Sequence, residues 1–131
     1  MMVLDTHVII WLALQPKKLS TKAKQAIRKA NQGNGMIFCE ISLWGIAMLM
    51  RKGRLKVDVD YLKFIELIVS AYPFVFKGIT PEIAQLSAHL PPQVNLDPAD
   101  RIIAATAVIE NVPLITADRN LLSAEMIPTL W

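Results

Sequence analysis

The sequence lacks the features that would assign it to several common protein classes. Its single cysteine, Cys39, excludes an internal disulfide and suits a reducing compartment, so we expect a cytoplasmic protein with Cys39 in its core. No apolar run reaches the roughly 18 residues needed to cross a bilayer. No basic and apolar signal segment precedes the first acid, Asp5. We therefore expect no membrane association.

Several catalytic and ligand-binding motifs are also missing. There is no glycine-rich phosphate loop, because Gly33-Asn34-Gly35 is explained by a turn. The one cysteine and the two histidines, His7 and His89, do not form a zinc-binding pattern, and no Ser-His-Asp arrangement has a nucleophile elbow. A hydrogen-bonded structural role is expected for His7, although it lies close to Asp5 in sequence. The groups left for chemistry are carboxylates.

Charges are distributed unevenly along the chain. Residues 1–56 carry ten Lys and Arg against two acids, and residues 57–131 carry four against nine. A basic half beside an acidic half suits a protein that attracts a polyanion to a site holding a metal ion. The lysine-rich segment 17–29, however, could equally be an ordinary solvent-exposed helix face with no role in binding a polyanion.

Short apolar strands alternate with helices. Strands are predicted at 2–4, 36–38, 74–76 and 114–116, with an edge strand near Ile127, and helices at 6–14, 21–32, 40–50, 61–70, 81–88 and 98–110, followed by a short helix that opens at 117–120. This alternation predicts one α/β domain over residues 1–131. We expect a three-layer α/β/α sandwich around a short parallel sheet of four to five strands.

Acidic residues occur where strands end and helices begin. Asp5 and Asp118 each follow a strand and precede a helix, while Asp97 and Asp100 occupy the N-cap and third position of another helix. Helix capping alone explains each acid taken singly. Ligands of open α/β sheets, however, bind at the carboxyl ends of the strands. Acids converging there would repel one another unless a cation lay between them, and oxygen ligands favour Mg²⁺ or Mn²⁺ over zinc.

Four segments, in order over nearly the whole chain, resemble the PIN domain and, within it, VapC-type toxins of bacterial toxin–antitoxin pairs. They are Asp5-Thr6-His7, Ser42-Leu43-Trp44, Asp97-Pro98-Ala99-Asp100-Arg101 and Thr116-Ala117-Asp118-Arg119. The resemblance implies a compact PIN-like α/β/α fold and a metal-dependent ribonuclease. It also implies a homodimer and a cognate antitoxin that occupies the active-site groove.

The same resemblance implies roles for particular residues. The positions of Asp5, Asp100 and Asp118 match the family's catalytic, metal-binding acids. The segments also place Asp97, Thr116 and Thr6 as supporting residues, with Asp97 more a helix cap than a metal ligand. Mg²⁺ or Mn²⁺ held by the three acids would activate water for cleavage of an RNA phosphodiester.

The chain departs from the family pattern at one position. The family's second acid follows the tryptophan of the Ser-Leu-Trp motif, where this chain has Gly45. Glu40 is a candidate substitute, but on a helix it would lie about 140° around the axis from residue 45. It would reach the site only if it belonged to the preceding loop. We therefore expect reduced activity, or a PIN-like module that binds RNA and antitoxin without cleaving.

Which basic residues contact RNA is open at this stage. Lys17, Lys18, Arg51, Lys52 and Arg54 are candidates on charge alone. Arg101 and Arg119 each follow a candidate site acid, so they either contact phosphate or form salt bridges with neighbouring carboxylates. A phosphatase using the same acids is disfavoured, because the residues after Asp5 do not supply the motif of a nucleophilic aspartate.

Overall fold

The computed structural model describes all of residues 1–131. Its strands are β1 (Val3–Leu4), β2 (Met36–Cys39), β3 (Phe74–Lys77), β4 (Leu114–Ile115) and β5 (Thr129–Leu130). Its helices are α1 (Thr6–Leu14), α2 (Thr21–Gln32), α3 (Ile41–Arg51), α4 (Tyr61–Ala71), α5 (Pro81–His89), α6 (Pro98–Glu110) and α7 (Arg119–Ser123), with a 3₁₀ turn, η1 (Pro16–Lys18), after α1. The predicted alternation of strands and helices is confirmed.

The five strands form one parallel sheet in the order β3-β2-β1-β4-β5. β1 lies in the middle, with Val3 paired to Ile37 of β2 on one side and to Leu114 of β4 on the other. Because all strands run in the same direction, their carboxyl ends meet at one edge of the sheet. The segments that follow β1 and β4 therefore begin next to each other, which is the placement predicted for Asp5 and Asp118.

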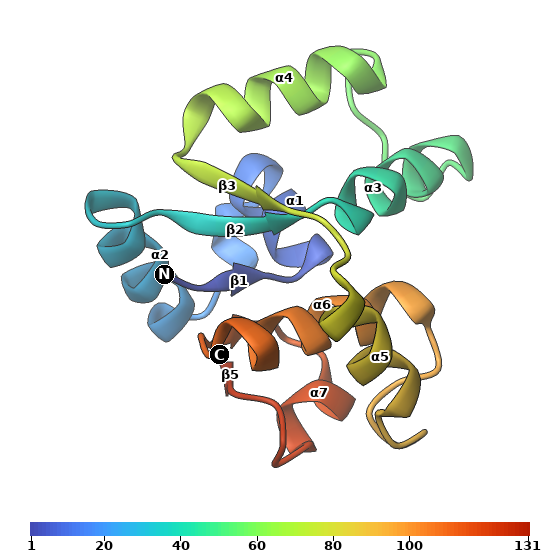
Figure 1. Ribbon diagram of the computed structural model, residues 1–131. Coiled ribbons are helices and arrows are strands. Elements are labelled where there is room, and N and C mark those ends of the chain that lie inside the picture. The colour runs from blue at the N-terminus through green and yellow to red at the C-terminus, as the bar shows by residue number, and fades with distance from the viewer.

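Helices cover both faces of the sheet (Figure 1). Successive strand residues point to opposite faces, so Leu4 and Phe38 pack with α1, α2, α3 and α4, whereas Val3 and Ile37 pack with α5, α6 and α7. Each face buries its own apolar cluster of aliphatic and aromatic side chains. The result is the predicted three-layer α/β/α sandwich.

Local capping explains where most helices begin. The N-cap side chains that accept a backbone N–H are Asp5, Ser20, Asp60, Thr80, Asp97 and Asp118. Pro81 and Pro98 follow two of these caps at the first helical position, where a missing N–H costs nothing. The predicted helix starts at 6, 21, 61, 81 and 98 are confirmed.

The edge strand near the end of the chain was predicted too early. Ile127 is buried on the face of the sheet that α5, α6 and α7 cover. Its N–H donates a hydrogen bond to the carbonyl oxygen of Ala124 in a turn. The strand itself is β5, whose Thr129 pairs with Leu114 of β4. The apolar character of Ile127 correctly indicated a buried residue. It did not indicate which residues form the strand, because that depends on pairing with β4.

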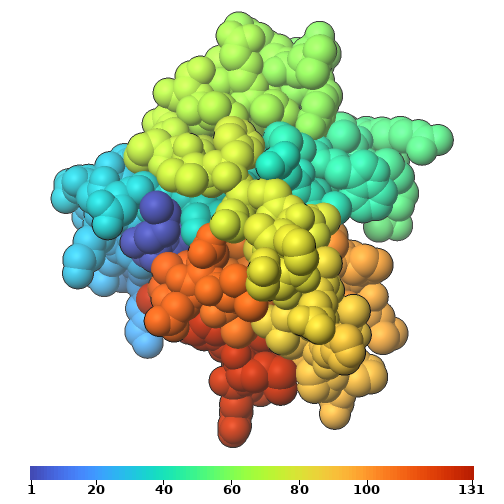
Figure 2. Space-filling view, in the orientation of Figure 1, coloured from blue at the N-terminus to red at the C-terminus, as the bar shows by residue number.

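The loop between α5 and α6 runs past the acids that begin α6 and α7. In the space-filling view α5, this loop and α6 are coloured yellow to orange and lie next to one another on the surface (Figure 2). Within the loop, Val94 is buried while Leu96 is exposed. None of the helices has the length and apolar character required to span a membrane.

Candidate active site

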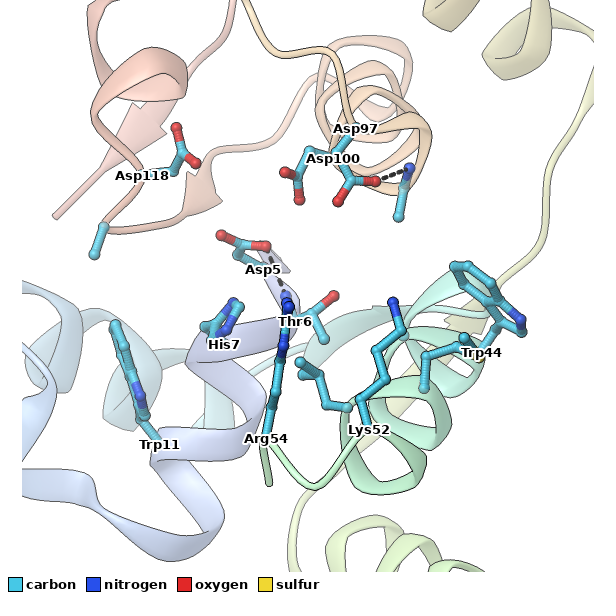
Figure 3. A pocket seen from close by; sticks show the side chains of 15 residues that line it. Asp5, Thr6, His7, Trp11, Trp44, Lys52, Arg54, Asp97, Asp100 and Asp118 are labelled. Carbon is cyan, nitrogen blue, oxygen red and sulfur yellow. Dashed lines mark hydrogen bonds between the residues drawn. The ribbon is translucent and has the colours of Figure 1, made fainter. Parts of the chain in front are cut away.

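A pocket of about 420 Å³ opens at the carboxyl edge of the sheet. Asp5, Asp97, Asp100 and Asp118 all line it, and Lys52 and Arg54 reach toward them from the opposite side (Figure 3). The remaining lining residues are Thr6, His7, Trp11, Trp44, Gly45, Met48, Leu49, Ala99 and Ala117. The pocket therefore has an acidic wall and a basic wall facing each other.

Asp5 is the deepest of the acids, with only 6% of its surface exposed. Its Oδ1 accepts the N–H of Thr6 at 2.7 Å, and its Oδ2 accepts the hydroxyl of Thr116 at 2.7 Å. Burial raises the pKa of Asp5, against the opposing effects of the Thr116 hydroxyl and the nearby His7. Two hydrogen bonds thus fix the orientation of a carboxylate that burial disfavours in its charged form.

Thr116 connects Asp5 to Asp118. Its buried hydroxyl donates to Asp5 and also accepts the N–H of Asp118 at 3.0 Å. Asp118 Oδ1 caps α7 by accepting the N–H groups of Asn120 and Leu121, at 2.9 and 3.1 Å. Thr116 was expected to be a supporting residue, and these contacts give that expectation a physical basis.

Asp100 faces Asp5 and Asp118 from the first turn of α6. Burial and the charges of Asp5, Asp97 and Asp118 together raise its pKa to about 7. Its Oδ2 accepts a hydrogen bond from Asn95 Nδ2 at 3.0 Å, and the same nitrogen donates to Asp118 Oδ2 at 3.2 Å. Asn95 was missed in the sequence because a single amide in an irregular loop carries no periodic or motif signal.

The start of α3 packs beneath the pocket. Thr6 Oγ1 and the buried Ser42 Oγ are hydrogen-bonded at 2.8 Å, joining α1 to α3. Gly45 lies one turn further along α3 and lines the pocket. A Cβ at Gly45 would lie 3.5 Å from Thr6 Cγ2, which is ordinary van der Waals contact. The backbone at this position therefore has room for a Cβ atom.

The other walls of the pocket are aromatic and basic. Trp44 is 58% exposed at one end, and His7 and Trp11 lie at the other with ring centroids 6.0 Å apart (Figure 3). His7 is exposed and lines the pocket, so the expected hydrogen-bonded structural role was wrong. The exposed side chains of Lys52 and Arg54 extend from the turn after α3 toward the acids.

The structure divides the candidate RNA-binding residues. Lys17, Lys18, Arg51 and Arg119 are exposed and do not line the pocket, and Lys18 Nζ lies over the Trp11 ring, 5.7 Å from its centroid. Glu40 is also exposed and outside the pocket, with Oε1 beside Gly78. Glu40 does precede the first residue of α3, which was the condition for reaching the site, but its side chain lies outside the pocket and does not take the place of the acid missing at Gly45.

Both roles considered for Arg101 were wrong. It forms no salt bridge, and its guanidinium is not free to bind phosphate. Its Nε donates to the carbonyl oxygen of Ser87 at 3.0 Å, its Nη1 to those of Pro91 and Asn95 at 3.2 and 2.9 Å, and its Nη2 to that of Leu90. All of its contacts are thus with the backbone of α5 and the following loop. The guanidinium secures that loop against α6.

The acids suit a hard divalent cation by donor type and by charge. Carboxylate oxygens are the preferred ligands of such ions, and mutual repulsion among Asp5, Asp100 and Asp118 is a cost that a cation would remove. No three His, Cys, Asp or Glu side chains lie at ligand spacing in the structure. The side chains therefore fit such an ion in donor type and charge but not in spacing, and the carboxylates would have to move closer together to bind it.

Comparisons with known proteins agree with this architecture. The family model described as PIN domain matches residues 2–125. Ribonuclease VapC22 of Mycobacterium tuberculosis is 35% identical over 120 residues, which cover 92% of this chain and 88% of that protein.

Solved structures with the same fold include several toxin–antitoxin complexes. A toxin–antitoxin complex from Klebsiella pneumoniae matches with a TM-score of 0.67 at 20% identity, covering 100% of this chain and 97% of that one. VapBC2 from Rickettsia felis, bound to a DNA fragment from its promoter, matches with a TM-score of 0.71 at 12% identity, covering 98% and 96%. DNA-bound VapBC from Salmonella typhimurium matches with a TM-score of 0.69 at 14% identity, covering 98% of this chain and 96% of that one. At these identities the likeness is one of fold.

Proposed function

The chain belongs to the PIN domain family, and on that basis we propose that it is an endoribonuclease, the toxin of a toxin–antitoxin pair. The relative at 35% identity is named a ribonuclease, and it aligns with most of this chain. The structural neighbours include a toxin–antitoxin complex and VapBC complexes bound to DNA. Together they favour cleavage of RNA under the control of a protein partner.

One observation carries the proposal. Asp5, Asp100 and Asp118, which come from three separate segments, line a single pocket opposite Lys52 and Arg54. An acidic wall facing a basic wall is the arrangement needed to hold a cation and a phosphodiester together. A purely structural role for the acids as helix caps gives no reason for Asp5 and Asp100 to keep carboxylates in surroundings that raise their pKa values.

The residues of the pocket would divide the work as follows. Lys52 and Arg54 draw the RNA backbone into the pocket, since both are exposed cations facing the acids. Asp5, Asp100 and Asp118 hold the cation. Thr116 keeps Asp5 and Asp118 in fixed orientations through its hydroxyl. Thr6 supports Asp5 through its backbone N–H and supports α3 through Ser42.

PIN-domain ribonucleases generally depend on divalent metal ions. We propose Mg²⁺ or Mn²⁺ here, because the three candidate ligands, Asp5, Asp100 and Asp118, are all carboxylates, and these ions prefer oxygen ligands. The chemistry that such an ion supplies when bound is activation of water and neutralisation of charge on the phosphate.

Cleavage of single-stranded RNA by metal-free and metal-loaded protein tests the function. Protein treated with a chelator should be inactive, and Mn²⁺ or Mg²⁺ should restore cleavage. Asp5→Asn and Asp118→Asn should each lower the rate by at least about 100-fold, because each removes one charge from the ligand set. Glu82→Gln on the distant α5 is a suitable control and should cleave as the wild type does. Cleavage that persists with chelator, or in both Asn variants, would argue against a metal-dependent nuclease.

A second candidate is favoured by Gly45, which lines the pocket where the family pattern has an acid. In that case the chain binds RNA and antitoxin without cutting. The two functions separate in one experiment with Mn²⁺, in which RNA is examined on native and denaturing gels. A binding module shifts the RNA on the native gel and leaves its length unchanged on the denaturing gel.

We also propose two protein partners, an antitoxin and a second copy of the chain. Large apolar side chains are exposed on α4 and β3, including Leu62 at 77% and Val75 at 47%, which supports contact with another protein surface. Light scattering of the isolated chain should give the mass of a dimer. Co-expression with a candidate antitoxin should yield a complex that no longer cleaves RNA. A monomeric mass would contradict the dimer, and a complex that cleaves RNA as fast as the isolated chain would contradict the role of the antitoxin.

A further inference from the structure

Asn95 makes a pair of contacts that the family comparison does not explain. Its Nδ2 donates one hydrogen to Asp100 Oδ2 at 3.0 Å and the other to Asp118 Oδ2 at 3.2 Å. A primary amide nitrogen has two hydrogens, so both are engaged. The side chain thus joins the first turn of α6 to the N-cap of α7, the two places from which these acids project.

The two carboxylates depend on Asn95 to different degrees. Asp118 is also held through Oδ1 by the N–H groups of Asn120 and Leu121. Asp100 has no other hydrogen bond to its carboxylate in the structure, so Asn95 alone orients it. Loss of the amide would leave Asp100 free to rotate away from Asp118, because the two negative charges repel.

Asn95 itself is held by the fold. Its carbonyl oxygen accepts Arg101 Nη1 at 2.9 Å, and the same guanidinium bonds the carbonyl oxygens of Ser87, Leu90 and Pro91. Its Oδ1 accepts the N–H of Leu96 at 3.2 Å, which orients the amide so that its nitrogen faces the acids. Arg101 therefore anchors the loop, and the loop presents Asn95.

We propose that Asn95 is a positioning residue that holds Asp100 and Asp118 together for cation binding, an inference that rests on the proposed function. A neutral amide is suited to this task. It bridges the two carboxylates without cancelling their charge, whereas a lysine or arginine there would compete with the cation. One hydrogen bond to each Oδ2 also leaves further lone pairs on both carboxylates for a metal ion.

Mn²⁺ binding, measured by the electron paramagnetic resonance signal of the free ion, tests the inference without reference to cleavage. Asn95→Ala should bind Mn²⁺ at least about 10-fold more weakly than the wild type, the usual effect of losing a residue that orients metal ligands. Asn120→Ala is the matched control, because Asn120 contacts Asp118 only through its backbone N–H. Its Mn²⁺ affinity should stay within about twofold of the wild-type value.

Two further measurements separate positioning from a general loss of structure. Circular dichroism and thermal unfolding should show that Asn95→Ala remains folded at the temperature of the binding assay. If it does not, Asn95→Ser, which is too short to bridge both carboxylates, replaces it with the same expected weakening. The Asn95→Ala change should also have a smaller effect in an Asp100→Asn background, because one of its two partners is then altered. A purely structural role predicts the same fold-change in both backgrounds.

The outcomes distinguish this inference from the proposed function. Wild-type protein that binds Mn²⁺ and cleaves RNA, with Asn95→Ala indistinguishable from it, would overturn the role of Asn95 and leave the function standing. Wild-type protein that binds no Mn²⁺ would overturn both.

Discussion

The hydroxyl of Thr116 donates a hydrogen bond of 2.7 Å to Asp5 Oδ2, across the ends of two neighbouring parallel strands. The two residues are 111 positions apart in the chain. The same oxygen accepts the N–H of Asp118, so a single buried hydroxyl sets the positions of two candidate metal ligands. The geometry of the site therefore depends on the pairing of β1 with β4.

Thr116→Val tests that dependence. Valine has nearly the same shape but removes the donor to Asp5 and the acceptor for Asp118, so we expect RNA cleavage to fall by about 10- to 100-fold. The free energy of unfolding should fall by about 1–3 kcal/mol, because the N–H of Asp118 loses its partner. Thr116→Ser keeps the hydroxyl and should retain most of the cleavage rate. Equal rates for the valine and serine variants would show that the hydroxyl has no positioning role.

Gly45→Glu tests the effect of the missing acid on α3. The added Cβ makes only ordinary contact with Thr6, so the change should fold. A fifth carboxylate at the pocket should raise Mn²⁺ affinity and the rate of RNA cleavage by about 10-fold or more. Gly45→Gln has the same size without the charge and is the control, and both variants gain helix propensity over glycine. Equal cleavage by the wild type and the Glu variant would contradict the expectation of reduced activity.

The metal-free protein should lose stability as the pH rises. An ordinary aspartate has a pKa of 3.8, whereas the pKa of Asp100 is about 7 in the folded chain, so between these values the folded state keeps a proton that the unfolded state has released. Its free energy of unfolding therefore falls with rising pH until both states are ionised. Thermal unfolding in the presence of a chelator should give a Tm roughly 5 °C lower at about pH 8 than at about pH 5. Asp5, whose pKa is also raised, contributes in the same direction.

Asp100→Asn is the control for this pH dependence. The amide does not titrate, so the difference in Tm between the two pH values should shrink markedly. A wild-type Tm that is unchanged or higher at the alkaline pH would contradict the assignment of Asp100 as a partly buried carboxyl with a raised pKa.

Lys52 and Arg54 are expected to contact RNA phosphates. Replacing both with Ala should weaken RNA binding and should lower the slope of log affinity against log salt by about 0.7 for each single-strand phosphate that is no longer neutralised. The double change Lys17→Ala with Lys18→Ala removes the same charge outside the pocket and should affect binding much less. Similar losses in the two variants would indicate nonspecific attraction by the basic half of the chain.

Local signals in the sequence predicted much of the fold and part of the site. Asp97 before Pro98 and Asp60 before an apolar helical run are caps whose hydrogen bonds span only a few residues, so they can be recognised without the tertiary structure. Asp5 and Asp118 each lie between a strand and a helix, and the parallel sheet then requires them to be neighbours. The family resemblance added Asp100, which α6 places in the same pocket.

Other parts depend on contacts that the sequence does not encode locally. Arg101 follows a site acid, which suggested phosphate binding, yet the shape of the α5–α6 loop turns its guanidinium to backbone carbonyl oxygens. Asn95 belongs to that loop and acquires its role only when α6 and α7 meet. Strand β5 was misplaced at Ile127 for a similar reason, because the ladder with β4 decides which residues pair.

The central place of β1 in the sheet has a consequence for synthesis. A ribosome adds Asp5 early and adds Thr116, the residue that orients it, 111 positions later. While the chain is emerging, β1 can pair with β2 but still lacks β4, and the pocket has neither Asp100 nor Asp118. The pocket is therefore incomplete in any nascent chain that lacks Asp118, and it can assemble only when nearly the whole chain has been synthesised.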